Sequence, residues 1–428
     1  MNVLPKQGRI AYRARTRPEE CFVSLNHYLD KEWLEDAYRR TRKDGAVGVD
    51  GVTAQEYARH LQDNLRELSD RARSGRYKAP PVKRGYVPKA GSSEQRPIGM
   101  PAFEDKVLQR GVTMILEPVY EQDFLDCSYG FRPRRSAHQA LETVWKQIMG
   151  MSGCWILDVD VRKFFDTLEP EHLRDILDRR IRDGVIRRLI DKWLAAGVWE
   201  SGSISYPQAG TPQGGCISPM LSNIYLHTVL DEWFEREIKP RLKGRAFLIR
   251  FADDFVMGFE HESDARRVWE VLPKRLGRFG LSIHPDKTRL VDFRKPQGRS
   301  QPGTFQLLGF THHWGRSHKG NLVVKRSTAK DRTARTLKGL GQWCRKNRHH
   351  PVAEQQKKLN QKLRGHYAYF GITGNYQSLW RVYQQTRRLW CKWLARRTRG
   401  RKGMNWERFE KLETVFPLAR PRILHSYT

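Results

Sequence analysis

The apolar residues of segment 155–166 follow a period of two. One set occupies positions 155, 157, 159 and 161, and the other contains Ile156, Asp158 and Asp160. Alternate residues of a β-strand point to opposite faces of the sheet. We therefore predict a strand with one apolar face and one face that presents carboxylates.

Residues 249–256 form two β-prone runs on either side of the acidic pair Asp253 and Asp254. This pattern predicts a hairpin with the pair at its tip. Carboxylates delivered from separate strands suit a two-metal phosphoryl-transfer site, because Mg²⁺ takes hard oxygen ligands and two ions must hold the attacking and leaving oxygens.

The C-terminal third has a helical pattern. A polar and basic run with few helix breakers predicts a helix over residues 327–343, and apolar or aromatic residues at helical spacing predict helices over residues 353–370 and 379–397. Large aromatic residues are interleaved with the basic ones. For most of Tyr367, Tyr369, Trp380 and Tyr383 we favour a place in the core of a small helical bundle over direct stacking on RNA.

The chain of 428 residues has a formal net charge of +32 and a pI of about 10.2. About 20 of these charges fall in residues 325–403, which hold 22 Lys or Arg against two acids. Such a balance predicts a polyanionic partner, and the shift in charge marks a domain boundary near residue 320. A membrane surface is the rival partner. It is disfavoured because no apolar span is present, and the longest charge-free run, residues 201–230, contains four Gly and three Pro.

The six cysteines are scattered and form no CxxC pair. This spacing predicts neither a zinc site nor a disulfide framework. We expect a reduced, cytoplasmic protein.

Three motifs in order resemble those of reverse transcriptases. Asp160 is followed five residues later by Phe165, residues 210–219 read GTPQGGCISP, and residues 251–254 read FADD. Further matches resemble bacterial group II intron reverse transcriptases, the intron-encoded proteins called maturases. They are GAVGVDG at 45–51, VPK at 87–89, QRPIGMP at 95–101, SYGFRPRRS at 128–136, LSIHPDKT at 281–288 and LLGF at 307–310.

The resemblance runs from about residue 30 to about residue 400, with two departures. Phe251 stands where Tyr is commoner, and Cys216 stands where Pro is frequent. Neither removes a metal ligand, so they bear on fidelity or processivity.

The resemblance implies a catalytic centre with two Mg²⁺ ions. Asp160 and Asp253 are the implied metal ligands, Asp254 is a supporting acid, and the main-chain carbonyl of Val161 completes the set. Asp158 is an auxiliary group. We expect Asp166, helped by Thr167, to cap the helix that opens around Pro170.

The resemblance also implies contacts to the incoming nucleotide. Lys89 and Arg96 match the triphosphate contacts, with a solvated surface charge as the alternative for each. Gln213 would approach the nascent base pair, and Phe165 would exclude a 2′-hydroxyl. Lys287 is either a general acid toward pyrophosphate or a surface lysine.

The expected architecture is an α/β right-hand polymerase, with fingers and palm over residues 31–320, an antiparallel palm sheet, and an all-helical thumb, or domain X, over residues 321–400. Residues 1–30 are expected to be a basic extension, flexible or docked on RNA. Residues 401–428 are expected to be a short basic tail without the C-terminal nuclease of some relatives. RNA contacts are expected from the thumb arginines Arg364, Arg387, Arg388, Arg396, Arg397 and Arg399.

The predicted function is that of a group II intron RNA-directed DNA polymerase, which binds intron RNA to assist splicing and copies it by target-primed reverse transcription. Its predicted partners are intron RNA, an RNA template with a DNA primer, target DNA and dNTPs, in a ribonucleoprotein on nucleoid DNA. No oligomeric state is predicted. Two alternatives remain open: a splicing maturase that no longer polymerises, and a domesticated reverse transcriptase in repair or phage defence.

Overall fold

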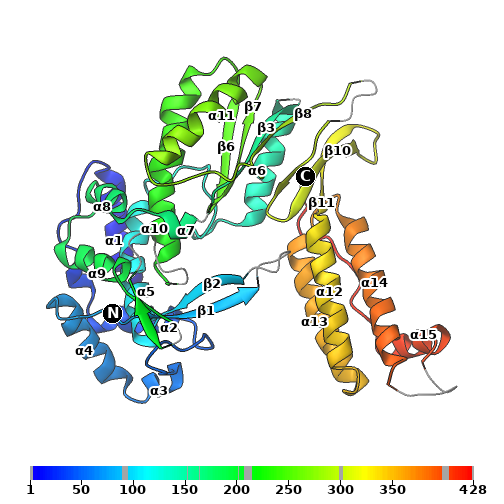
Figure 1. The fold of residues 1–428 in the computed structure, drawn as a ribbon, viewed down its shortest axis with the longest axis horizontal. Coiled ribbons are helices and arrows are strands. Elements are labelled where there is room, and N and C mark those ends of the chain that lie inside the picture. Colours follow the sequence, from blue (N-terminus) through cyan, green and yellow to red (C-terminus); the bar gives the residue numbers. More distant parts are fainter. Residues whose placement is uncertain are drawn as a thin grey trace. The chain divides into compact units, whose positions relative to one another are not determined.

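The computed structural model describes residues 3–88, 95–151, 153–162, 164–200, 202–206, 215–297, 302–397 and 404–426. It consists of two compact units (Figure 1). The first contains Met1–Ala140 and Leu157–Leu290, and the second contains Leu141–Ile156 and Val291–Thr428. The chain therefore passes between the units near residues 140, 156 and 290. Fingers, palm and thumb are defined by their roles in a polymerase, so the predicted division into these parts stays a prediction.

The first unit opens with helices packed around the apolar helix α5. They are α1 (Val3–Thr16), η1 (Asn26–Tyr28), α2 (Lys31–Arg40), α3 (Ala54–Ala58), α4 (Leu61–Arg73) and α5 (Phe103–Tyr120). Helix α1 buries Val3, Ile10 and Ala14, which the helical period places on one face. Gln7 of α1 donates to the carbonyl of Met114 in α5 at 3.0 Å.

The expectation of a flexible extension is therefore wrong for residues 3–30. The chain after α1 is also held in place. The buried guanidinium of Arg180 donates to the carbonyls of Pro18 and Glu20, each at 2.6 Å, and pairs with Asp123 at 2.9 Å. This charge is satisfied within the unit.

A mixed sheet with strand order β2-β1-β4-β5 follows. Its strands are β1 (Val82–Pro88), β2 (Gln95–Met100), β4 (Val198–Glu200) and β5 (Ser203–Ser205). Strand β1 pairs antiparallel with β2 and parallel with β4. This sheet is therefore mixed. The predicted antiparallel sheet is a different one, which carries the carboxylates and is described next.

The sheet that carries the predicted carboxylates has the strand order β6-β7-β3-β8. Its strands are β3 (Gly153–Asp160), β6 (Ala246–Phe251), β7 (Asp254–Phe259) and β8 (Arg289–Arg294). Strands β6 and β7 pair antiparallel, as expected. Other elements of this part of the chain are α6 (Ala137–Gly150), α7 (Phe164–Thr167), α8 (Pro170–Asp178), α9 (Gly184–Leu194), α10 (Ser218–Leu226), the π-helical η2 (His227–Ile238), η3 (Lys239–Arg241) and α11 (Glu262–Gly277).

One local prediction near this sheet is wrong. Residue 166 lies inside α7, and the residue that precedes α8 is Glu169. Asp166 therefore does not cap the helix that opens at Pro170. The hydroxyl of Thr167 donates to the carbonyl of Phe164 at 3.5 Å.

The second unit combines a small antiparallel sheet with a helical bundle (Figure 1). The sheet contains β9 (Phe305–Leu307), β10 (Phe310–Arg316) and β11 (Leu322–Thr328), and the helices are α12 (Lys330–Lys346), α13 (Val352–Phe370), α14 (Tyr376–Leu394) and α15 (Trp406–Val415). The three helices predicted from the sequence are confirmed, with boundaries shifted by up to three residues.

The bundle core contains two of the four aromatic residues that we expected there, Tyr367 and Tyr383, together with the fully buried Trp390. Tyr369 is only partly buried, and its hydroxyl donates to the carbonyl of Leu308 at 2.9 Å. Trp380 also lies outside the core, because its side chain is 40% exposed. Its ring stacks on that of Tyr376, which is also exposed, with centroids 6.3 Å apart.

The C-terminal segment is part of this bundle and not a loose tail. Phe409 of α15 is fully buried in the core, where its ring meets Trp390 edge to face at 5.5 Å. Beyond α15, the amide of Ala419 donates to Asn360 at 2.7 Å. Over the described ranges, no helix is both long enough and apolar enough to cross a bilayer.

Candidate active site

The acidic pair at 253 and 254 lies at the tip of a tight hairpin, as predicted. Phe251 of β6 pairs with Asp254 of β7, so the turn consists of Ala252 and Asp253. Ala252 has a φ of 58°, a left-handed conformation that costs a non-glycine residue about 1 kcal/mol or more. The turn that presents Asp253 is therefore strained and needs support from its surroundings.

Asp160 ends the strand next to this hairpin, because β3 and β7 are neighbours in the sheet. The chain at Val161 is fixed by an antiparallel bridge to Ile283. The carbonyl of Asp160 accepts from His284 at 2.7 Å, and the amide of Arg162 donates to Ser282 at 2.8 Å. In such a pair the central residue's own N–H and C=O point away from the partner strand. The carbonyl of Val161 thus points away from Ile283.

Two basic side chains from the segment after this bridge meet the two acids of β3. The ammonium of Lys287 lies 3.0 Å from Oδ2 of Asp160, and both groups are about half exposed. The guanidinium of Arg289 lies 3.3 Å from Oδ2 of Asp158. Asp158 is thus engaged by Arg289, and its auxiliary role stays a prediction.

Arg250, two residues before the strained turn, was missed by the sequence reading. Its side chain and that of Asp231 on η2 are both fully buried, and they form a bidentate ion pair at 2.6 and 2.8 Å. Burial by itself disfavours the charge, but the carboxylate of Asp231 holds the pKa of Arg250 above its ordinary value. The available signal was a lone arginine within an apolar strand, since such a residue needs a buried partner.

The segment that reads SYGFRPRRS packs directly on the hairpin. The amide of Arg250 donates to the carbonyl of Cys127, just before this segment, at 2.8 Å, and the carbonyl of Arg250 accepts from the amide of Tyr129 at 2.9 Å. Gly130 approaches the turn so closely that a β-carbon there would lie 2.4 Å from the nitrogen of Ala252. Asn223 of α10 donates to the carbonyl of Gly130 at 2.7 Å.

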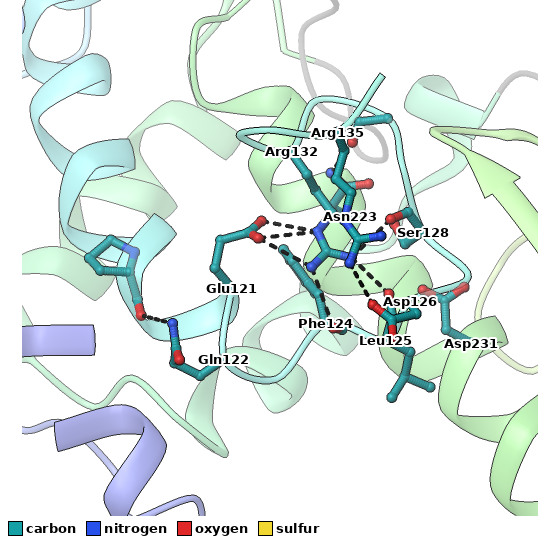
Figure 2. A network of polar contacts seen from close by, with 12 residues as sticks. Glu121, Gln122, Phe124, Leu125, Asp126, Ser128, Arg132, Arg135, Asn223 and Asp231 are labelled. Carbon is teal, nitrogen blue, oxygen red and sulfur yellow. Dashed lines mark hydrogen bonds and ion pairs between the residues drawn. The ribbon is translucent and has the colours of Figure 1, made fainter. Parts of the chain in front are cut away.

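A second buried arginine braces the same segment (Figure 2). Arg132 is 4% exposed and pairs with Glu121 at 3.1 Å. It also donates to the carbonyls of Leu125 and Ser128 at 2.7 and 2.9 Å. These bonds fix the conformation of the loop between α5 and α6, which packs against the hairpin.

Comparison with known proteins agrees with this geometry. Residues 87–312, which contain β3, the hairpin and the segments that brace them, match the family model described as reverse transcriptase (RNA-dependent DNA polymerase). The chain belongs to the reverse transcriptase family.

This reverse transcriptase is related to group II intron-encoded proteins and intron maturases. Protein YkfC of Escherichia coli (strain K12) is 33% identical over 325 residues, which cover 68% of this chain and 85% of YkfC. Group II intron-encoded protein LtrA of Lactococcus lactis subsp. cremoris is 33% identical over 242 residues, 55% of this chain and 40% of LtrA. Nuclear intron maturase 1, mitochondrial, of Arabidopsis thaliana is 29% identical over 113 residues, 26% of this chain and 15% of that protein. The chain thus spans less than half of each of these two intron-related proteins.

Several predicted nucleotide contacts of the reverse transcriptase fall where no side chain is described. Lys89 and Gln213 lie outside the described residues. Arg96 pairs through its backbone with Val87 in the β1–β2 hairpin, and Phe165 lies in α7. These four assignments stay predictions.

A small cavity lies close to the segment that precedes α10. Its lining includes Asp105, Gln109, Gly215, Ile217 and Ser218. Burial raises the pKa of Asp105 to about 6, against the opposing effect of hydrogen bonds from Tyr77, Trp193 and Gln109. Gln109 connects this carboxyl to the segment before α10, because the amide of Ile217 donates a hydrogen bond to Oε1 of Gln109 at 3.4 Å.

The arginines predicted to contact RNA differ in their surroundings. Arg364, Arg388 and Arg396 are exposed on the helical unit, and Arg396 lies 4.9 Å from the ring centre of Trp393. Arg397 donates to the carbonyl of His350. Arg399 lies outside the described residues.

Arg387 does not fit the predicted role. It is 17% exposed and forms an ion pair with Glu413 of α15 at 2.6 Å, and its guanidinium also lies 5.1 Å from the ring centre of Trp406. We therefore remove Arg387 from the expected RNA contacts, because its charge joins α14 to α15.

The donor chemistry at the carboxylates fits a hard divalent cation. Among the described residues, no three His, Cys, Asp or Glu side chains converge to hold a metal by themselves. Mg²⁺ is commonly held by one or two carboxylates and takes its remaining ligands from substrate phosphates and water. The aspartates at the end of β3 and in the β6–β7 turn match this mode of binding and not that of a closed protein cage.

Proposed function

We propose that this chain is an RNA-directed DNA polymerase of the group II intron type, which copies intron RNA by target-primed synthesis and assists its splicing. The observation that carries the proposal is the placement of Asp160 and Asp253. Asp160 ends β3 and Asp253 immediately precedes the neighbouring strand β7 of the same sheet, within the residues that match the reverse transcriptase family. The sequence spacing predicted this placement, and the fold supports it.

In this proposal Asp160 and Asp253 hold two Mg²⁺ ions, with the carbonyl of Val161 as a further ligand and Asp254 as a supporting acid. The bound ions would supply charge neutralisation and orientation to a primer 3′-hydroxyl that attacks the α-phosphate of a dNTP. The protein's own contribution is rigidity. The bridge at Val161 and the braced hairpin keep both carboxylates in place before the substrate arrives.

The remaining nucleotide contacts are proposed on the family pattern. Lys89 and Arg96 would bind the triphosphate, Gln213 would lie at the nascent base pair, and Phe165 would exclude ribonucleotides. Lys287 is within reach of the reacting phosphates because it contacts Asp160. We assign it the transfer of a proton to the leaving pyrophosphate.

RNA binding is assigned to the helical unit, which we propose acts as the thumb, or domain X. Arg364, Arg388 and Arg396 are exposed there and would neutralise backbone phosphates. The exposed rings of Tyr376 and Trp380 offer a surface on which unpaired bases stack. Intron RNA, RNA template with DNA primer, target DNA and dNTPs are the proposed partners.

The test is Mg²⁺-dependent DNA synthesis on an RNA template. Asp160→Asn and Asp253→Asn should each lower the rate by roughly 10²-fold or more, because each removes a ligand charge from the reacting centre. RNA affinity should be unchanged, since the basic surface is elsewhere. Asp292→Asn is a matched control. Asp292 is an aspartate of β8, the strand next to β3, but it pairs with Arg294 at 2.7 Å and is not a proposed metal ligand. Wild-type rates in both active-site variants would refute the assignment.

Splicing assistance without synthesis is the second function to be tested. It is favoured by the concentration of charge on the helical segment, which needs no carboxylate to bind RNA. An Asp253→Asn protein should still accelerate splicing of the cognate intron. DNA synthesis by a wild-type protein that binds no structured RNA selectively would instead favour a domesticated enzyme.

A further inference from the structure

The guanidinium of Arg250 uses each of its five N–H groups. Nε and one Nη2 hydrogen bind Asp231, and the other Nη2 hydrogen binds Oγ of Ser128 at 2.8 Å. Nη1 donates to Oδ1 of Asn223 and to the carbonyl of Ala252, both at 3.0 Å. Arginine is the side chain with five donors in a fixed plane.

The partners of Arg250 come from the turn, from the continuous helical segment of α10 and η2, and from the loop after α5. Asp231 is on η2, Asn223 is on α10, and Ser128 belongs to the loop after α5. Ala252 is in the turn itself. The ion pair with Asp231 would neutralise the buried charge without the other bonds. The remaining donors therefore serve to align α10 and the loop after α5 with the turn.

The bond to Ala252 acts on the strained residue of the site. The left-handed conformation of Ala252 persists only where the surroundings hold it. Arg250 holds its carbonyl, and Gly130 lies against its nitrogen. Asp253 is the next residue, so the direction of its carboxylate depends on this peptide.

We propose that Arg250 is a positioning residue, which fixes the turn at Ala252 and thereby aims the carboxylate of Asp253 at the reacting centre. This role rests on the function proposed above. Arg250 itself touches no substrate, because its side chain is fully buried.

The experiment removes the clamp without leaving a buried charge alone. Arg250→Met combined with Asp231→Leu replaces the ion pair by apolar groups of similar size, a change that folded proteins often tolerate. Two quantities are measured on the full-length protein. Hydrogen exchange over residues 246–259, without added metal, reports the stability of the hairpin. Steady-state synthesis separates kcat from the KM for dNTP.

We expect faster exchange over residues 246–259 in the double variant. We also expect kcat to fall by roughly 10²-fold, the effect of misplacing a reacting group by about 1 Å. The KM for dNTP and the affinity for RNA should stay close to those of the wild type. A clamp that only stabilised the fold would lower the melting temperature and leave kcat per folded molecule unchanged.

Arg180 and Asp123 provide the matched control. They form another buried Arg–Asp pair that also binds main-chain carbonyls, but none of the partners of Arg180 is in the hairpin. Arg180→Met combined with Asp123→Leu should leave kcat and the exchange of residues 246–259 unchanged.

A second variant decides the matter if the double variant does not fold. Arg250→Lys keeps the charge opposite Asp231 but cannot reach Ala252, Asn223 and Ser128 together, and we expect the same loss of kcat and faster exchange. Wild-type kcat and exchange in whichever variant folds would overturn the proposal. If the wild type makes no DNA, the proposed function fails, and the exchange measurement still tests the clamp by itself.

Discussion

The ammonium of Lys287 lies 3.0 Å from Oδ2 of Asp160. The same carboxylate is the proposed ligand of a divalent cation, so the lysine and the cation compete for it. Lys287→Gln should therefore lower the Mg²⁺ concentration that gives half-maximal synthesis by roughly two- to fivefold, as expected for losing an exposed ion pair. If Lys287 also protonates pyrophosphate, kcat falls in the same variant. A Mg²⁺ titration of initial rates measures both effects.

Arg289→Gln is the control for that titration. It removes a cation from the neighbouring Asp158, which is not a proposed ligand. The half-maximal Mg²⁺ concentration should then stay at the wild-type value. Equal shifts in the two variants would point to a general change in surface charge.

Phe165→Ala should increase the use of rNTP relative to dNTP by roughly tenfold or more, because it opens space for the 2′-hydroxyl. Incorporation ratios on one RNA template measure the effect. Phe164 is the adjacent control, since its ring is buried against Tyr225. Phe164→Leu should affect stability and not sugar selection. An unchanged ratio in Phe165→Ala would mean that the register of Asp160 and Phe165 has been misassigned.

Exposed and internal arginines in α14 and just after it should behave differently in RNA binding. Replacing Arg388 and Arg396 by Ser should reduce the slope of log affinity against log salt by about 0.7 for each lost contact with single-stranded RNA. Arg387→Ser should leave that slope unchanged and destabilise the bundle by about 2 kcal/mol, because the partly buried Glu413 loses its ion-pair partner. Salt titrations and urea unfolding of the same proteins distinguish the two outcomes.

Asp105 should make the stability of the protein depend on pH. Its pKa in the folded protein is about 6, against about 3.9 in an unfolded chain. The unfolded chain therefore releases this proton first as the pH rises. The stability from Asp105 is complete below about pH 3.9 and is lost as the pH rises through about 6.

Asp105→Asn cannot ionise, so its stability relative to the wild type should rise by about 2 kcal/mol between about pH 4.5 and about pH 8. The variant starts from a lower value, because the Asn amide would face the amide of Gln109, which now donates to Oδ2. Urea unfolding at both pH values gives the difference. A constant offset between the two proteins would show that Asp105 is ionised in the folded state throughout.

The parts of the structure that were predicted correctly depend on local patterns. The hairpin at Asp253, the strand that ends at Asp160 and the helices of the bundle each follow from the residue pattern of a dozen or so neighbouring positions. The three-dimensional partners of Arg250 do not, because Asp231, Asn223 and Ser128 are 19, 27 and 122 residues away in the sequence. No local pattern indicates which distant side chains meet a buried charge.

The same limit explains the errors at the two ends of the chain. Residues 3–30 and 404–426 are rich in charge and were taken as extensions, yet each has an apolar face that is buried. Ile10 and Phe409 are almost completely inaccessible to solvent. The composition of a helix averages over all of its faces, whereas the burial of its side chains depends on whether one face packs against another element. A short amphipathic segment is therefore easily mistaken for a tail.

The close packing of Gly130 on the turn restricts directed evolution of this enzyme. Any other residue at position 130 brings a β-carbon to 2.4 Å from the nitrogen of Ala252, and main-chain atoms cannot give way without moving Asp253. A library that varies position 130 would consist almost entirely of inactive clones. Phe251 is partly accessible beside Phe131, with ring centroids 6.4 Å apart. Diversity placed at position 251 can change how the enzyme handles its template without disturbing the turn.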